Sequence, residues 1–186
     1  MKVLSLLAIL FAIPVLVPAQ NIKEHPATYL DKGACPFECC TYRRWNTLRD
    51  TVAYALPDKR SKRMGTFKKG TWVRGMTGEV RTLTPGKFVV RKAHEKYRPG
   101  NILWIYSSIG EGFYKVWFKG KMFEENMYPF GWTIPNQGPT CTETRDCWGE
   151  LAVPLKTVWW VKVRSPAGWI GWTDQTENFG NMDSCG

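Results

Sequence analysis

The chain has 186 residues, and its 26 Lys and Arg outnumber its 16 Asp and Glu, which gives a net charge of +10. This length suits one compact domain or two small ones. Such a cation is expected to meet anionic partners readily, and charge alone does not choose among them. No segment after the first 19 residues is apolar enough to span a bilayer, so we expect no transmembrane anchor.

The first 19 residues are predicted to be a secretory signal peptide. Met1-Lys2 gives a positive start, residues 3–17 are almost wholly apolar, and small residues at 17–19 place the cleavage before Gln20. The apolar run is shorter than the roughly 20 residues of a spanning helix, which argues against a membrane anchor. We therefore expect export, to a periplasm or to the medium. Removal of the signal leaves 167 residues and a net charge of +9, because it carries a single Lys.

All six cysteines follow the signal, and an even number in an exported chain predicts three disulfides. Six cysteines allow 15 connectivities. The adjacent Cys39 and Cys40 are expected to have different partners, because a bond between neighbours is strained. Spacing favours a local Cys35–Cys40 bridge and a Cys141–Cys147 bridge across a short polar loop. These two pairs leave Cys39 for Cys185, a bridge that would tie the C-terminus to the N-terminal segment.

Residues 20–40 are predicted to be a mobile leader and a cysteine-rich entry, because residues 20–34 are polar and lack a period. The one weak helix candidate is 42–50. Short apolar bursts separated by Gly and Pro then predict strands over 51–56, 71–75, 79–83, 87–91, 101–107, 112–118 and 160–172, the last as a hairpin turning near 166–168. Many short strands with turns between them predict an all-β sandwich or barrel.

A faint internal repeat suggests two modules. Phe113–Val116 and Trp160–Val163 share an aromatic residue, a bulky residue and then Lys-Val, so that Lys and Val face opposite sides of a strand. The predicted modules cover 41–125 and 150–186, and residues 126–149 form a connecting loop rich in Gly, Pro and Cys. The second module is too short for a complete barrel, so it is either truncated or packed into the first.

Two segments resemble a known family. Residues 56–73, with the run Gly-Thr-Phe-Lys-Lys-Gly-Thr-Trp-Val, resemble the opening of a bacterial SH3-like (SH3b) domain, and residues 160–172 resemble its closing hairpin. The resemblance covers about half of the mature chain. It implies small, partly open, SH3-like β-barrels, here with a second partial module and disulfide staples, that bind peptides, glycans or wall components without catalysis. The chain departs from the family in the long stretch 75–97 and in the cysteine-rich entry.

The basic run Lys59, Arg60, Lys62 and Arg63 is the plainest surface feature. It is either a solvated loop tip or the rim of a site where clustered cations concentrate an anionic ligand. Its place after the opening strand is similar to that of a loop bordering the ligand groove in SH3-like barrels.

Three tryptophans are further candidates for ligand contact: Trp104, Trp117 and Trp159. Most aromatic side chains must fill the core. Trp159 and Trp160 are neighbours on a strand, however, so one of them is expected near the surface, under a loop or at a groove. An exposed Trp there can stack on a sugar or clamp a proline-rich peptide.

Catalytic and metal chemistry are the alternatives to ligand binding. A nucleophilic cysteine would need a histidine, but His25 lies in the leader and His94 in a charged loop. The N-terminal cysteine cluster has no neighbouring histidine to complete a zinc site. Glu111, Glu124 and Glu125 are a candidate carboxylate set for glycoside hydrolysis. We expect no catalysis, no metal and no cofactor.

The sequence therefore predicts an exported, non-catalytic SH3-like protein that binds an anionic cell-envelope polymer, a glycan or a peptide. Nucleic acid ranks last as a partner of an exported chain. The alternatives are a secreted enzyme or enzyme inhibitor with a loop-built site, and a structural subunit of an envelope assembly. The oligomeric state is left open. A shallow aromatic groove rimmed by Lys and Arg would favour binding, a deep acidic pocket an enzyme, and a flat apolar patch a structural role.

Overall fold

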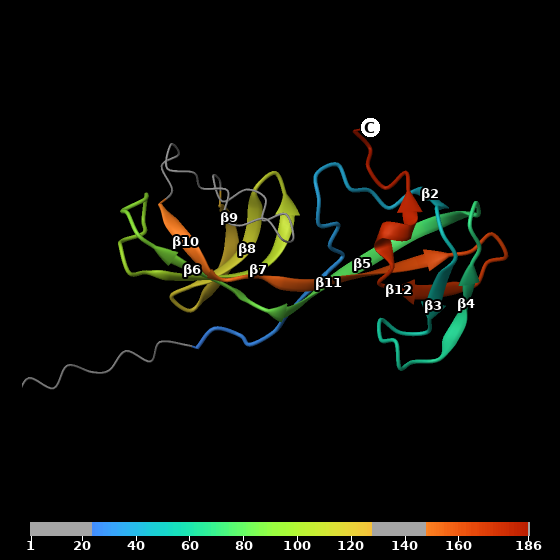
Figure 1. Ribbon diagram of the computed structural model, residues 1–186, viewed down its shortest axis with the longest axis horizontal. Helices are drawn as coiled ribbons and strands as arrows, with labels where there is room; N and C mark the ends of the chain where they lie inside the picture. Colours follow the sequence, from blue (N-terminus) through green and yellow to red (C-terminus); the bar gives the residue numbers. More distant parts are fainter. Residues whose placement is uncertain (1–23, 128–147, 186) are drawn as a thin grey trace, which may run out of the picture.

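The computed structural model describes residues 24–127 and 148–185, and the fold is all-β, as the sequence predicts. One 3-10 turn, η1 (Thr176–Asn178), interrupts the strands. Figure 1 shows the strands gathered at the two ends of an elongated molecule. Among the described residues no helix is long and apolar enough to cross a membrane.

The large sheet has eight strands and curls into a half-barrel. Its order is β13-β2-β5-β11-β12-β3-β4, with β1 paired to β5 beside β2. Its strands are β1 (Tyr29–Lys32), β2 (Arg44–Thr47), β3 (Thr51–Tyr54), β4 (Arg63–Phe67), β5 (Trp72–Thr84), β11 (Lys156–Arg164), β12 (Ile170–Thr173) and β13 (Phe179–Gly180).

The small sheet has five strands in the order β10-β6-β7-β8-β9. They are β6 (Gly86–Val90), β7 (Ile102–Gly110), β8 (Phe113–Phe118), β9 (Lys121–Asn126) and β10 (Gly149–Val153). The chain passes from β5 into β6 through Pro85 and returns from β10 into β11 through Pro154. Because proline has no N–H for a ladder, each proline ends one sheet and lets the next strand join the other. Figure 1 shows β5 and β11 running together between the two ends.

Each sheet packs on its own hydrophobic core. Val116 is fully buried in the small-sheet core, and Val163 is fully buried in the large-sheet core. These are the equivalent valines of the predicted repeat, and Lys115 and Lys162 precede them on the opposite faces of β8 and β11. The predicted alternation of Lys and Val is therefore confirmed in both copies.

The strand pairing departs from the predicted division at residues 125 and 150. β11 pairs with β5 over most of its length, β12 pairs with β3, and β13 pairs with β2. β11, β12 and β13 thus belong to the large sheet, and β10 belongs to the small one. The physical reason is that a strand as long as β5 exposes a row of backbone groups that needs a partner.

The predicted strands 71–75 and 79–83 are one strand, β5, with two glycines in its middle. A Cβ on Gly75 would lie 2.5 Å from the Trp45 ring, and one on Gly78 would lie 2.5 Å from Trp159 Nε1. These glycines therefore allow close packing inside a strand and do not mark a turn.

The prediction of a mobile leader is wrong for β1, and the weak helix candidate at 42–50 contains β2. β2 covers only residues 72–74 of one edge of β5, and β1 covers residues 79–82 of the same edge. Two short strands thus pair with this edge of β5, because unpaired backbone groups beside a core cost free energy.

Two of the three predicted disulfides are confirmed, Cys35–Cys40 and Cys39–Cys185. The second joins the N-terminal segment to the C-terminus across 146 positions. The predicted Cys141–Cys147 bridge, the signal peptide and most of the predicted connecting loop lie outside the described residues.

Candidate functional site

Three arginines lie side by side on three adjacent strands of the large sheet. Arg44 of β2 is directly opposite Arg74 of β5, and Arg74 is directly opposite Arg164 of β11. Residues opposite each other on antiparallel strands share a face, with Cβ atoms about 5 Å apart. Their neighbours in sequence, Val73 and Val163, point into the core. We call Arg44, Arg74 and Arg164 the arginine row.

The arginine row carries three positive charges without an internal counter-charge. Among the residues that the structure describes, none of the three guanidinium groups is in an ion pair, and all three residues are exposed. Other arginines do have partners: Arg81 binds Glu79 at 2.6 Å, for example. Like charges directly opposite each other destabilise a sheet. A row of three is therefore suited to an anion that neutralises it.

A cleft of about 300 Å³ opens at the arginine row. Besides the three arginines, Trp72, Val73, Ser165 and Pro166 line it. Trp72 lies two residues before Arg74 on the same face of β5, and it is 48% exposed. The Arg44 guanidinium carbon lies 5.4 Å from the centre of the Trp72 ring. The cleft thus combines fixed cations with an accessible flat ring.

Ser165 lines this cleft, and its side-chain hydroxyl is buried. The residue is 7% exposed, and its Oγ has no hydrogen-bond partner among the described residues. A buried polar group without a partner costs about 1–3 kcal/mol. The backbone holds it firmly, because Ser165 O accepts from Gly168 N at 3.0 Å and Ser165 N donates to Trp169 O at 2.9 Å. This is the turn predicted near 166–168.

The predicted basic loop is partly neutralised by its own neighbours. Lys59 Nζ lies 2.7 Å from Asp174, and this bond raises the pKa of Lys59. Arg60 binds Asp58 at 2.8 Å, and its hydrogen bonds lower the pKa of the Asp58 carboxyl to about 2. Lys62 is exposed, and Arg63 donates to Thr66 Oγ1 at 2.7 Å at the start of β4. Two of the four cations therefore already have an anionic partner.

The predicted tryptophans lie apart from this loop. Trp104 of β7 is directly opposite Trp117 of β8 in the small sheet. Trp159 packs half-buried against the large-sheet core, and the Phe37 ring lies nearly perpendicular to it with the ring centres 5.9 Å apart, as expected for a residue under a loop. Trp160 is 5% exposed on the other face of β11. The seven predicted residues therefore do not form one site.

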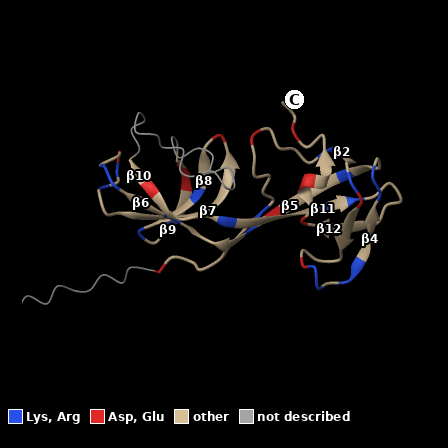
Figure 2. Cartoon of the chain, viewed as in Figure 1, with Lys and Arg blue, Asp and Glu red and all other residues tan. Residues whose placement is uncertain are grey.

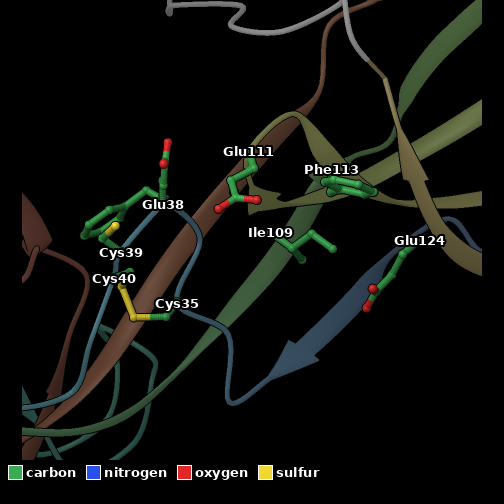
Figure 3. Close-up of a pocket in the computed structure, with 10 residues that line it drawn as sticks. Cys35, Glu38, Cys39, Cys40, Ile109, Glu111, Phe113 and Glu124 are labelled. Atoms are coloured by element: carbon green, nitrogen blue, oxygen red, sulfur yellow. A yellow bond between two sulfur atoms is a disulfide. The ribbon is translucent and has the colours of Figure 1, made fainter. Parts of the chain in front are cut away.

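A second cleft, of about 460 Å³, lies between the disulfide loop and the turn that joins β7 to β8 (Figure 3). Glu38, Glu111 and Glu124 line it, and Ile109 and Phe113 lie between Glu111 and Glu124 in the view. Glu124 is bound to Lys115 at 2.6 Å.

The carboxylates predicted for glycoside hydrolysis do not converge on one point. Glu124 and Glu125 are neighbours on β9 and point to opposite faces. Glu125 binds Lys96 at 2.8 Å and accepts a hydrogen bond from the Tyr97 hydroxyl. Glu111 and Glu124 line the second cleft, and Glu125 does not.

A scan against protein-family models found no match, and searches of curated proteins and of solved structures found no similar protein. The resemblance to SH3-like domains therefore stays a prediction.

The arginine row was missed by the sequence reasoning. The signal is local in part: Trp72-Val73-Arg74 and Val163-Arg164 alternate, so their polar residues face away from the core. Which arginine lies opposite which depends on the register of strands up to 90 positions apart, as Arg74 and Arg164 are, and no local pattern encodes it.

Proposed function

We propose that this protein is an exported binding protein that holds an anionic ligand on the arginine row. The observation that carries the proposal is the register of three unpaired arginines beside the buried, unpartnered hydroxyl of Ser165. Figure 2 marks Lys and Arg in blue and shows them on the strands of the large sheet. The two disulfides support an oxidising compartment, where such bonds persist.

The chemistry of the cleft favours sulfate, phosphate or carboxylate groups. A guanidinium presents a planar fork of donors that matches the oxygens of these groups, and such charge-assisted hydrogen bonds are stronger than neutral ones. The Ser165 hydroxyl adds a neutral donor, and Trp72 adds an apolar platform beside the charges. A bound anion also relieves the repulsion between the arginines, so binding should stabilise the fold.

The test compares two triple variants that remove the same number of charges. One replaces Arg44, Arg74 and Arg164 with Gln. The control replaces three exposed lysines elsewhere, Lys32, Lys69 and Lys121, with Gln. Dextran sulfate and polygalacturonate are the probes, and isothermal titration calorimetry gives the dissociation constants.

We expect the arginine-row variant to lose about tenfold or more in affinity, because each charge-assisted hydrogen bond contributes about 1.5–3 kcal/mol. The control variant should lose much less, since exposed charges act only through the screened field. Equal losses in the two variants would mean that net charge alone attracts the probes, and the proposed site would be wrong.

A further inference from the structure

A second line of cations and aromatic rings continues the face that carries the arginine row. Lys162 of β11 is opposite Trp172 of β12, Trp172 is opposite Tyr54 of β3, and Tyr54 is opposite Arg63 of β4. Lys162 lies two residues before Arg164, so it shares that residue's face. We call Lys162, Trp172, Tyr54 and Arg63 the aromatic ladder.

The arginine row and the aromatic ladder meet on β11 and together cross six neighbouring strands. Arg164 and Lys162 are about 7 Å apart along the strand. From β2 to β4 the path follows the curled sheet for about 24 Å, at about 4.8 Å per strand spacing. A single small anion needs only the row, so the remaining length is suited to a ligand with repeated units.

The ladder offers both charge and flat apolar surface. Lys162 Nζ lies 5.8 Å from the centre of the Trp172 ring, and neither Lys162 nor Arg63 is in an ion pair with a described carboxylate. Trp172 and Tyr54 are half-buried, so part of each ring remains accessible. The path therefore carries cations at both ends, with the Trp172 and Tyr54 rings between Lys162 and Arg63.

Trp160 and the β3–β4 loop lie beside the aromatic ladder, on the side away from the arginine row. Trp160 lies two residues before Lys162 on the same face, and it is buried with its ring 6.3 Å from that of Tyr54. The β3–β4 loop is tied to the end of β12 by the Lys59–Asp174 pair. A ligand on this face is thus directed across the strands, from the arginine row to the ladder.

We propose that the ligand is a linear anionic polysaccharide that spans the arginine row and the aromatic ladder; this rests on the proposed function. Sugar rings have apolar C–H faces that pack on Trp and Tyr, and their sulfate or carboxylate substituents pair with Arg and Lys. Stacking bases of single-stranded nucleic acid use similar surfaces. The disulfides favour a compartment outside the cytoplasm, where polysaccharides are the expected polyanions.

The test is a length series of heparin oligosaccharides, which carry both sulfate and carboxylate groups, from the disaccharide to the octasaccharide. Calorimetry measures the affinity of the wild type, of the arginine-row variant, and of a ladder variant with Lys162→Gln, Arg63→Gln and Trp172→Ala. A milder ladder variant with only the two Gln substitutions guards against unfolding, and thermal melting checks every protein.

For the wild type we expect affinity to rise with length until the ligand spans both parts. Each ladder variant should keep the disaccharide affinity and lose about fivefold or more for the octasaccharide. The arginine-row variant should lose affinity at every length. If ladder variants match the wild type at every length, the polysaccharide path is wrong while the arginine site stands; if the arginine-row variant binds like the wild type, the proposed function itself is wrong.

Single-stranded DNA of matched charge separates the two kinds of polyanion. Weaker binding of the DNA than of the octasaccharide supports a polysaccharide ligand. DNA that binds as tightly, with the same dependence on the ladder, would overturn the assignment to polysaccharide.

Discussion

The imidazole ring of His25 stacks on the indole ring of Trp104, with the ring centres 3.6 Å apart and the planes 17° apart. The Tyr106 hydroxyl donates to Pro26 O at 2.7 Å, and the ring centres of Trp117 and His25 are 6.2 Å apart. The aromatic pair predicted to contact a ligand therefore holds the chain's own N-terminal segment. These contacts place the segment against β7 and β8 and make part of the predicted leader part of the fold.

Replacing His25 with Ala should uncover Trp104. We expect a faster quenching of tryptophan fluorescence by acrylamide and a loss of about 0.5–1.5 kcal/mol in the free energy of unfolding, which is the contribution of an aromatic pair. Glu24→Ala is the matched control, because Glu24 is an exposed neighbour. If both variants had the same acrylamide quenching and the same free energy of unfolding as the wild type, the stacking would not be a stabilising contact.

The two disulfides should differ in how much they stabilise the chain. Cys39–Cys185 closes a loop of 146 positions and Cys35–Cys40 closes one of 5. In the chain-entropy model the long loop contributes about 5 kcal/mol and the short one about 2 kcal/mol. Urea unfolding of the two paired Cys→Ser variants measures both values, and a larger loss from the short bridge would contradict the entropic explanation.

The sequence predicted the strands well where a local alternation reports which side chains are buried. Val116 and Val163 illustrate this, since each follows a half-exposed lysine and each is fully buried. The arginine row was out of reach, because Arg44, Arg74 and Arg164 become neighbours only through long-range strand register. The glycines of β5 lie inside one strand where the sequence predicted two, because close packing and turns use the same residue type.

Stability should fall at alkaline pH because of buried tyrosines. Burial raises the pKa of Tyr42 and that of Tyr106 to about 12, from an ordinary value of 10. Between about pH 10 and pH 12 the unfolded chain has lost these protons and the folded chain retains them, so the free energy of unfolding decreases as the pH rises. Urea unfolding across this range measures the slope, and Tyr106→Phe should make it shallower. A slope unchanged by the substitution would exclude Tyr106 as a source.

The basic loop should contribute little to binding. Replacing Lys59, Arg60 and Lys62 with Ser keeps Arg63 on the ladder, and Lys59 and Arg60 are already paired with carboxylates. We expect less than about a threefold change in affinity for the heparin octasaccharide, because exposed charges are screened over about 8 Å at physiological salt. A loss of affinity as large as that of the arginine-row variant, measured at the same salt concentration, would mean that the basic loop binds the ligand.

Ser165→Ala should lower affinity without lowering stability. The Ser165 hydroxyl is buried without a partner, so its removal loses no internal hydrogen bond and should leave the free energy of unfolding unchanged or raise it by about 1 kcal/mol. Affinity for dextran sulfate should fall about threefold to tenfold, the loss of one hydrogen bond of about 0.5–1.5 kcal/mol.

Ser184→Ala is the mirror control for this substitution, because the Ser184 hydroxyl donates to Cys39 O at 2.9 Å and lies outside the cleft. It should lower stability and leave affinity unchanged. Thermal unfolding without ligand and calorimetry with dextran sulfate measure the two quantities on the same preparations. If Ser165→Ala destabilises the chain and binds normally, its hydroxyl has a structural partner and does not reach the ligand.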